Sequence, residues 1–193
     1  MALVGSGTFP GQRPGLLAGA LSGAAALGDG ATRAGSHRDG ASSGIGRALA
    51  LAFARQGARV VLAARREDRL EDIRREIELY APDVLVVPTD LAEDDQVVRL
   101  VQSTLAHFGR VDVLVNNAGI THNGYLHKQD PATLRQMVTL NLTAVVRLSQ
   151  EVLPRMLYQR SGYIVNVGSA VAGLAPPMFS SYTATKSGLS GFF

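Results

Sequence analysis

The sequence predicts an α/β fold in which a doubly wound, mainly parallel sheet is covered by helices on both faces. Two observations support this class. Short runs rich in Val, Ile and Leu alternate with amphipathic segments of helical length, as in successive βαβ units with right-handed crossovers. A glycine-rich turn, Gly40 to Gly46, opens the first of the helical segments, which is where such sheets bind phosphate groups. The 193 residues, 46% of them hydrophobic, suffice for one domain with a substantial core.

The expected elements follow one another in a regular order. A helix should run from the glycine turn to about Arg55, and later helices should cover 67–80, 93–108 and 131–156, with another beginning at Tyr182. Acidic residues open the helix at 93, and Pro131 is suited to a first helical turn. Strands buried on both faces are expected at 59–64, 84–87, 111–115 and 163–167.

The first 39 residues differ in composition from the rest of the chain. Gly, Ala, Ser and Pro dominate there, no acidic residue precedes Asp29, and ten of the 21 glycines fall within the first 40 positions. We therefore divide the chain into a Gly/Ala-rich leader, 1–39, and a folded body, 40–193, and expect the leader to be disordered. Because the leader is poor in acidic residues and carries arginines, an organelle-targeting peptide is the alternative.

The composition excludes several classes of function. Without cysteine there is no disulfide framework, thiolate zinc site or cysteine nucleophile. The four histidines lack the spacing of metal ligands, so we expect no metal. A net charge of +3, spread along the chain, does not indicate nucleic-acid binding. No apolar stretch reaches 18 residues, so no membrane-spanning helix is expected.

The glycine turn predicts a dinucleotide site. Glycines at this spacing allow a tight turn and a close approach to a pyrophosphate, which the amino end of the following helix then binds. The candidate turn residues are Gly40, Ser42, Ser43, Gly44, Ile45 and Gly46. After the strand at 59–64 the chain has Arg65 and Arg66 instead of an acidic residue. Two guanidinium groups suit a 2′-phosphate, which favours NADP over NAD; alternatively, they simply begin a solvated helix.

A second set of residues predicts proton transfer. Tyr182 and Lys186 stand four apart in an expected helix, and so share one face. A nearby ammonium favours the charged form of a phenol, which can then exchange a proton with a substrate oxygen. Ser169, just beyond a strand, can donate a hydrogen bond to the same oxygen. Taken alone, however, a Tyr and a Lys at this spacing are usually a surface pair.

The ordered set of motifs resembles the classical short-chain dehydrogenase/reductase family. GASSGIG is followed by Asn116-Asn117-Ala118-Gly119, then by Asn141, Ser169, Tyr182 and Lys186, each in the structural context that the motif requires. The resemblance covers residues 40–193, about four fifths of the chain. It implies a Rossmann-type fold and hydride transfer between a nicotinamide and a ketone or secondary alcohol.

The resemblance also implies a role for each site residue. Tyr182 is the expected general acid or base, Lys186 holds the nicotinamide ribose and favours the phenolate, and Ser169 orients the carbonyl. Asn141 is expected to hold a water for proton relay. The remaining implied cofactor contacts are Asp90 and Leu91 at the adenine, and Asn117, Ala118 and Gly119 along the cofactor channel. His122, His127 and the apolar segment 171–178 lie where relatives meet substrate, although exposed loop histidines are the simpler interpretation. The family further implies a cytoplasmic homodimer or homotetramer.

Two departures from the family pattern concern completeness. The residues before the turn, 34–39, do not suit a buried central strand, and the only apolar run upstream, Met1–Val4, is far from Gly40. The chain also ends at Phe193, where relatives continue through further strands. We therefore expect an incomplete sheet that lacks its first strand and its C-terminal strands. The alternative function is an inactive fragment that at most binds a nucleotide or a homologous subunit.

Overall fold

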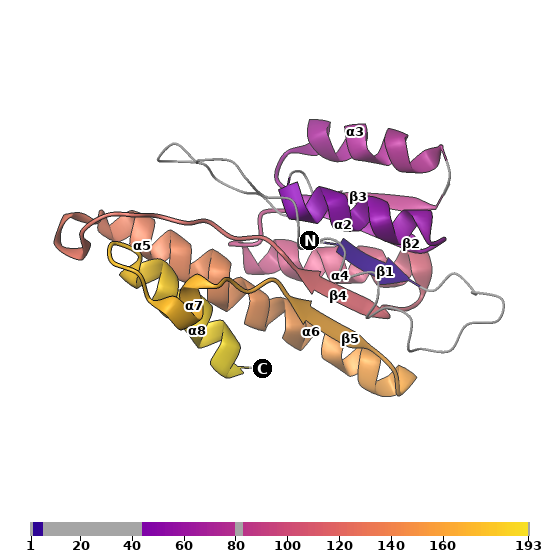
Figure 1. Ribbon diagram of the computed structural model, residues 1–193. Helices are drawn as coiled ribbons and strands as arrows, with labels where there is room; N and C mark the ends of the chain where they lie inside the picture. The colour runs from indigo at the N-terminus through magenta and orange to yellow at the C-terminus, as the bar shows by residue number, and fades with distance from the viewer. Residues whose placement is uncertain (1, 6–43, 80–82, 193) are drawn as a thin grey trace.

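The computed structural model describes residues 2–5, 44–79 and 83–192, with the backbone alone described at 2–5. One five-stranded sheet of order β3-β2-β1-β4-β5 forms its centre (Figure 1). The strands are β1 (Ala2–Gly5), β2 (Arg59–Ala64), β3 (Val84–Pro88), β4 (Val113–Asn116) and β5 (Tyr163–Asn166). The predicted α/β class with a doubly wound sheet is confirmed.

The helices begin and end close to where the sequence places them. They are α2 (Gly44–Arg55), α3 (Glu67–Glu78), α4 (Asp94–Phe108), α5 (Pro131–Val138), α6 (Ala144–Gln159), α7 (Val171–Leu174) and α8 (Ser180–Phe192). The expected single helix over 131–156 is instead two helices joined by a π-helical turn, Thr139–Thr143. A short 3-10 turn, Leu126–Lys128, and the four-residue α7 were not expected from the sequence.

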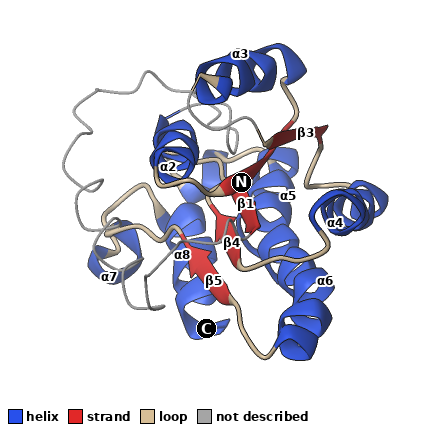
Figure 2. Ribbon diagram, turned by 90° about the vertical axis from the view of Figure 1, so that its right-hand side faces the viewer, coloured by secondary structure: helices blue, strands red, loops and turns tan. Residues whose placement is uncertain are grey.

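Alternation along the strands divides the core into two halves. Val60 and Leu62 of β2 pack with residues of α2 and α3, whereas Val61 and Ala63 pack with residues of α4 and α6. In β4, Leu114 belongs to the α4 and α6 half. Figure 2 shows α2 and α3 on one side of the sheet and α4 and α6 on the other. Burial on both faces is what the continuous apolar runs predicted.

The central strand corrects one expectation. The position between β2 and β4 is not empty: β1 fills it, and runs antiparallel to both neighbours. Ala2 pairs with Leu62 and Val115, and Gly5 pairs with Arg59. A reversed strand needs no tight connection to the glycine turn, and so Ala2–Gly5 can form it despite its distance from Gly40. The backbone groups of β2 and β4 that would otherwise lack partners are thereby satisfied. The remaining leader residues, 6–39, lie outside the described part of the chain.

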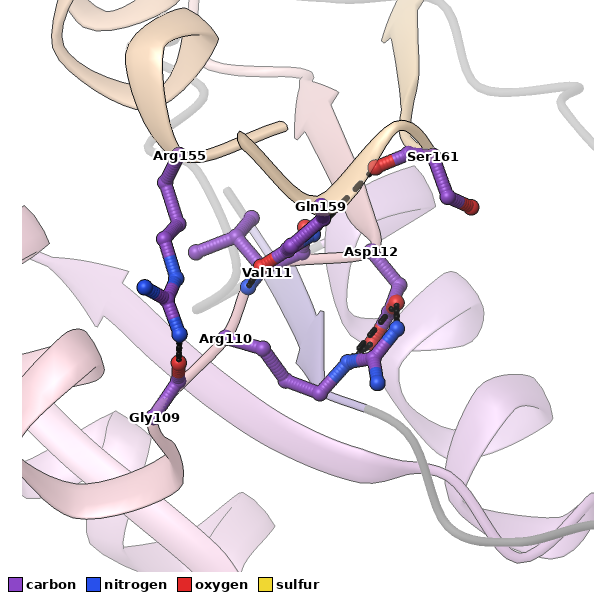
Figure 3. A network of polar contacts seen from close by, with 7 residues as sticks. All are labelled: Gly109, Arg110, Val111, Asp112, Arg155, Gln159 and Ser161. Atoms are coloured by element: carbon purple, nitrogen blue, oxygen red, sulfur yellow. Dashed lines mark hydrogen bonds and ion pairs between the residues drawn. The ribbon is translucent and has the colours of Figure 1, made fainter. Parts of the chain in front are cut away.

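A network of polar contacts ties the edge of the sheet at the amino ends of β4 and β5 (Figure 3). The Gln159 side chain, at the end of α6, accepts a hydrogen bond from Val111 N–H at 3.2 Å and donates to the Val111 carbonyl at 2.8 Å. Arg110 forms a bidentate ion pair with Asp112, and Arg155 donates to the Gly109 carbonyl. This network fixes the end of α6 against the start of β4, at the end of the sheet opposite the loops that follow the parallel strands.

Candidate active site

The candidate site lies at the carboxyl ends of the parallel strands. The loops that follow β2, β3, β4 and β5 all leave the sheet at that edge, where open α/β sheets bind their ligands. The side chains of Asn116 and Asn166, which end β4 and β5, are joined by a 2.9 Å hydrogen bond. This bond holds the two loops together where their strands stop.

Asn141 is the buried centre of the site. It lies in the π-helical turn between α5 and α6 and is fully buried. Its Oδ1 accepts a hydrogen bond from Ile120 N–H at 2.9 Å, and its Nδ2 donates to the Ile120 carbonyl at 2.8 Å. This reciprocal pair fixes the loop after β4 against the turn. Single π-turns of this kind occur frequently at functional sites.

Tyr182 and Lys186 lie on α8, as expected, and face the same region. The Lys186 Nζ lies 6.0 Å from the centroid of the Tyr182 ring and donates a 2.8 Å hydrogen bond to the Val167 carbonyl, just beyond β5. Only 6% of Lys186 is exposed, and this burial lowers the pKa of its ammonium below the ordinary lysine value. A buried ammonium is costly unless it has hydrogen-bond partners, so the Val167 carbonyl stabilises Lys186 in this position.

Because Gly119 has no side chain, the loop after β4 can lie close to Asn141 and Lys186. A Cβ at this position would lie 3.1 Å from Asn141 Oδ1 and 3.8 Å from Lys186 Nζ. The backbone of the loop after β4 therefore passes directly over both side chains. Gly119, Asn141 and Lys186, far apart in sequence, are thus brought into one cluster beside Tyr182.

Ser169 is held by its own loop. Its Oγ accepts a 3.3 Å hydrogen bond from Val171 N–H, at the start of α7. The segment that follows contains two non-glycine residues with positive φ, Ala175 at 43° and Met178 at 68°. The Met178 carbonyl accepts a 2.8 Å hydrogen bond from Gly124 N–H, so this segment packs on the loop that carries His122. His122 is half-buried and His127 is exposed.

A hollow beside the end of β2 contains the predicted adenosine contacts. Its walls include Ala64, Arg65, Asp90, Leu91 and Ala118. The Asp90 backbone N–H donates to Gln96 at 2.8 Å, and its carboxylate accepts from Ala92 N–H at 3.0 Å. The loop after β3 is therefore held by its own hydrogen bonds. Arg66 is half-buried and lies just before α3.

The described residues include only the second part of the glycine turn, Gly44 to Gly46. Gly44 begins α2 with a φ of +55°, a conformation that favours glycine. Ile45 is exposed and Gly46 is buried. Gly40, Ser42 and Ser43 lie outside the described residues. Since α2 leads into the start of β2, its amino end lies at the carboxyl edge of the sheet, where a helix terminus suits a phosphate.

Three contributors to the site were not predicted from the sequence. They are the side chain of Thr185, the carbonyl of Val167 and the backbone of Ile120. The backbone groups carry no signal in a residue pattern, because any residue supplies them. Thr185 carries a weak signal, as a hydroxyl between Tyr182 and Lys186 in the same helix.

In the described part of the chain, no three His, Asp or Glu side chains gather where a metal ion could bind. None of the described helices has the length and apolar character needed to cross a membrane.

The fold and the motif residues together define a protein of the short-chain dehydrogenase class. The family described as short chain dehydrogenase matches residues 39–193, and the chain belongs to that family.

Among its relatives is the 3-oxoacyl-[acyl-carrier-protein] reductase FabG of Staphylococcus epidermidis, 37% identical over 153 residues that cover 79% of this chain and 63% of that protein. The human dehydrogenase/reductase SDR family member 7 is 36% identical over 158 residues, covering 80% of this chain and 47% of the relative. A metagenomic short-chain oxidoreductase solved in complex with NADP superposes with a TM-score of 0.77 at 37% identity, covering 79% of this chain and 70% of that one. The chain spans about three fifths of the length of the FabG proteins that it matches.

Proposed function

We propose that the protein is an NADP-dependent oxidoreductase that transfers a hydride between the nicotinamide and a ketone or secondary alcohol. The observation that carries the proposal is the cluster of Gly119, Asn141 and Lys186 beside Tyr182. A buried ammonium close to a phenol, at the ligand-binding edge of the sheet, provides an acid and its electrostatic support in one place.

Each residue has a distinct task in this proposal. Tyr182 gives a proton to the carbonyl oxygen during reduction and takes it back during oxidation. The Lys186 ammonium, 6.0 Å from the centroid of the Tyr182 ring, holds the ribose beside the phenol. Ser169 donates a hydrogen bond to the substrate oxygen. Asn141 keeps the loop after β4 in place through Ile120, and its backbone is the proposed site of a relay water.

The described residues fit a nicotinamide dinucleotide. The missing Cβ at Gly119 leaves room above Lys186, and the hollow beside Arg65 and Leu91 has the place of an adenosine site. The amino end of α2 suits the pyrophosphate. When bound, the dinucleotide supplies or accepts the hydride. Arg65 and Arg66 support NADP over NAD, and two structural relatives were solved in complex with NADP or 5-hydroxy-NADP.

The test is the oxidation of NADPH by the purified chain, followed by absorbance, with a panel of small ketones and a 3-oxoacyl thioester. We expect turnover with at least one ketone, and loss of at least a hundredfold in kcat for Tyr182→Phe, which is the usual scale of general acid–base catalysis. Tyr158→Phe is the matched control, because Tyr158 is 80% exposed on α6 and should leave turnover unchanged. A Tyr182→Phe variant as active as the unmodified chain would reject the assigned acid.

A second candidate is a catalytically inactive relative that binds a nucleotide or a homologous subunit. The reversed β1 favours it: the chain leaves β1 at Gly5, beside Arg59, at the edge of the sheet away from the site, so that β1 does not lead into the glycine turn as a parallel strand would. Nucleotide binding without turnover on the full panel would support this candidate. A cytoplasmic location and a homodimer or homotetramer remain predictions from the family resemblance.

A further inference from the structure

Thr185 lies between the two proposed catalytic residues of α8 and is 3% exposed. Its Oγ1 donates a 2.8 Å hydrogen bond to the Tyr182 carbonyl, one turn earlier in the helix. The same oxygen accepts a 3.1 Å hydrogen bond from Asn141 Nδ2. A hydroxyl has one proton to donate and lone pairs to accept with, so the side chain uses both functions at once.

These two bonds extend the network around Asn141 to the catalytic helix. Asn141 Nδ2 has two acceptors, the Ile120 carbonyl and Thr185 Oγ1. The loop after β4, the π-helical turn and α8 are therefore joined through two buried side chains. Because the Asn141 amide is bonded to both the N–H and the carbonyl of Ile120, a rotation of the amide would also disturb the loop after β4.

We propose that Thr185 is a positioning residue: its hydroxyl holds α8 against Asn141, and so sets the place of Tyr182 and Lys186 relative to the loop after β4. This inference rests on the proposed function for its effect on turnover. The two hydrogen bonds of Thr185, to Asn141 and to the Tyr182 carbonyl, are present in the free protein. A threonine is suited to the task because it can bond the carbonyl of the preceding helical turn. Burial then makes the loss of the acceptor costly for Asn141.

The chain offers a matched pair of substitutions on one helix. Thr185→Val replaces the hydroxyl by a methyl group of similar size and removes the acceptor from Asn141. Thr183→Val makes the same change two residues earlier, where the buried Thr183 hydroxyl has no hydrogen-bond partner among the described residues. Thr185→Ser keeps the hydroxyl and should behave like the unmodified chain.

The first readout is turnover. We expect kcat of Thr185→Val to fall about tenfold with KM changed less than twofold, since one buried hydrogen bond to a positioned group is lost. Thr185→Ser should restore kcat, and Thr183→Val should not lower it. If the unmodified chain shows no turnover, the proposed activity fails for this chain, and the second readout decides about Thr185 by itself.

The second readout is ¹³C NMR of the lysine Cε atoms in the free protein. The sequence contains two lysines, Lys128 and Lys186, and a Lys128→Arg variant assigns the signals. Burial lowers the pKa of Lys186, and within the described residues the titratable side chain of Tyr182 faces it. Loosening α8 admits water, so Thr185→Val should raise the pKa of Lys186 toward its ordinary value, whereas Thr185→Ser and Thr183→Val should not.

The proposal is overturned if Thr185→Val matches Thr183→Val in the Lys186 titration. It remains testable if Thr185→Val fails to fold. In the unmodified chain the Asn141 side-chain amide protons should be protected from exchange with solvent, because both acceptors hold them. Exchange at the rate of an exposed asparagine would overturn the proposal without any variant.

Discussion

Gly119 is the position where the packing of the site can be tested most sharply by a single added atom. In Gly119→Ala the new Cβ would lie 3.1 Å from Asn141 Oδ1, 3.7 Å from Asn141 Cγ and 3.8 Å from Lys186 Nζ. At 3.1 Å the contact with Oδ1 is closer than ordinary van der Waals packing, so one of the two groups must move by a few tenths of an ångström. The question is which partner moves.

Asn141 cannot move without cost. It is fully buried, and its amide is held by Ile120 N–H, the Ile120 carbonyl and the Thr185 hydroxyl. Relief of the contact therefore lengthens at least one of these hydrogen bonds or shifts the backbone. Overpacking of this kind costs about 1–3 kcal/mol. For a chain of this size that corresponds to a fall in Tm of roughly 2–12 °C.

The assay is thermal and urea unfolding followed by far-UV circular dichroism, with Gly173→Ala as the control. Gly173 lies exposed in α7, and a Cβ there would meet no atom within 4 Å, so alanine should leave the free energy of unfolding unchanged or raise it. If Gly119→Ala unfolds at the same urea concentration as the unmodified chain, the close packing of the loop after β4 on Asn141 is refuted.

Three further predictions follow from the electrostatics and the topology. The Lys186 Cε signal should titrate below the ordinary lysine range in ¹³C NMR, because burial lowers the pKa of the ammonium. Arg65→Asp should shift the ratio of NADPH to NADH affinity toward NADH by about tenfold or more, since it exchanges a guanidinium for a carboxylate at the 2′-phosphate. A disulfide should form between Leu3→Cys and Leu114→Cys in this cysteine-free chain, because these residues pair directly across β1 and β4.

Each of the three has a control or a contradicting result. A Lys186 signal that titrates in the ordinary lysine range would contradict its burial. Arg69→Asp, at an exposed position on α3, should leave the cofactor ratio unchanged, and an equal shift would show a nonspecific effect of charge. Leu3→Cys combined with Ser161→Cys should not cross-link, since Ser161 does not pair with β1. Failure of Leu3→Cys to link with Leu114→Cys would refute the register of β1.

Much of the fold follows from apolar runs and helix-boundary residues that can be read directly from the sequence. The runs at 60–64 and 84–88 are apolar throughout, so the sequence alone predicts strands buried on both faces. Two helix boundaries have local causes: α5 begins at Pro131, after the N-cap Asp130, and α4 ends before Gly109, which has a φ of 72°. The family resemblance is confirmed, whereas the roles of the individual site residues remain predictions.

The features that escaped prediction depend on contacts remote in sequence. The direction of β1 is set by the two strand edges that receive it, and four residues carry no signal for parallel or antiparallel pairing. The π-helical turn that presents Asn141 arises where α5 passes into α6, without a proline or glycine to mark it. Thr185 belongs to the site through its hydrogen bond from Asn141, which lies 44 residues earlier in the chain.

The most direct test of the proposed chemistry is the transfer of deuterium from NADPH that carries deuterium at both hydrogen positions of the nicotinamide C4 to the carbonyl carbon of a ketone, measured by mass spectrometry with the purified chain. The arrangement of Tyr182 and Lys186 predicts a product carrying one deuterium at the carbinol carbon, and none above background with Tyr182→Phe. A product without the label, or the same labelling by the Tyr182→Phe variant, would contradict the proposal that this site performs the hydride transfer.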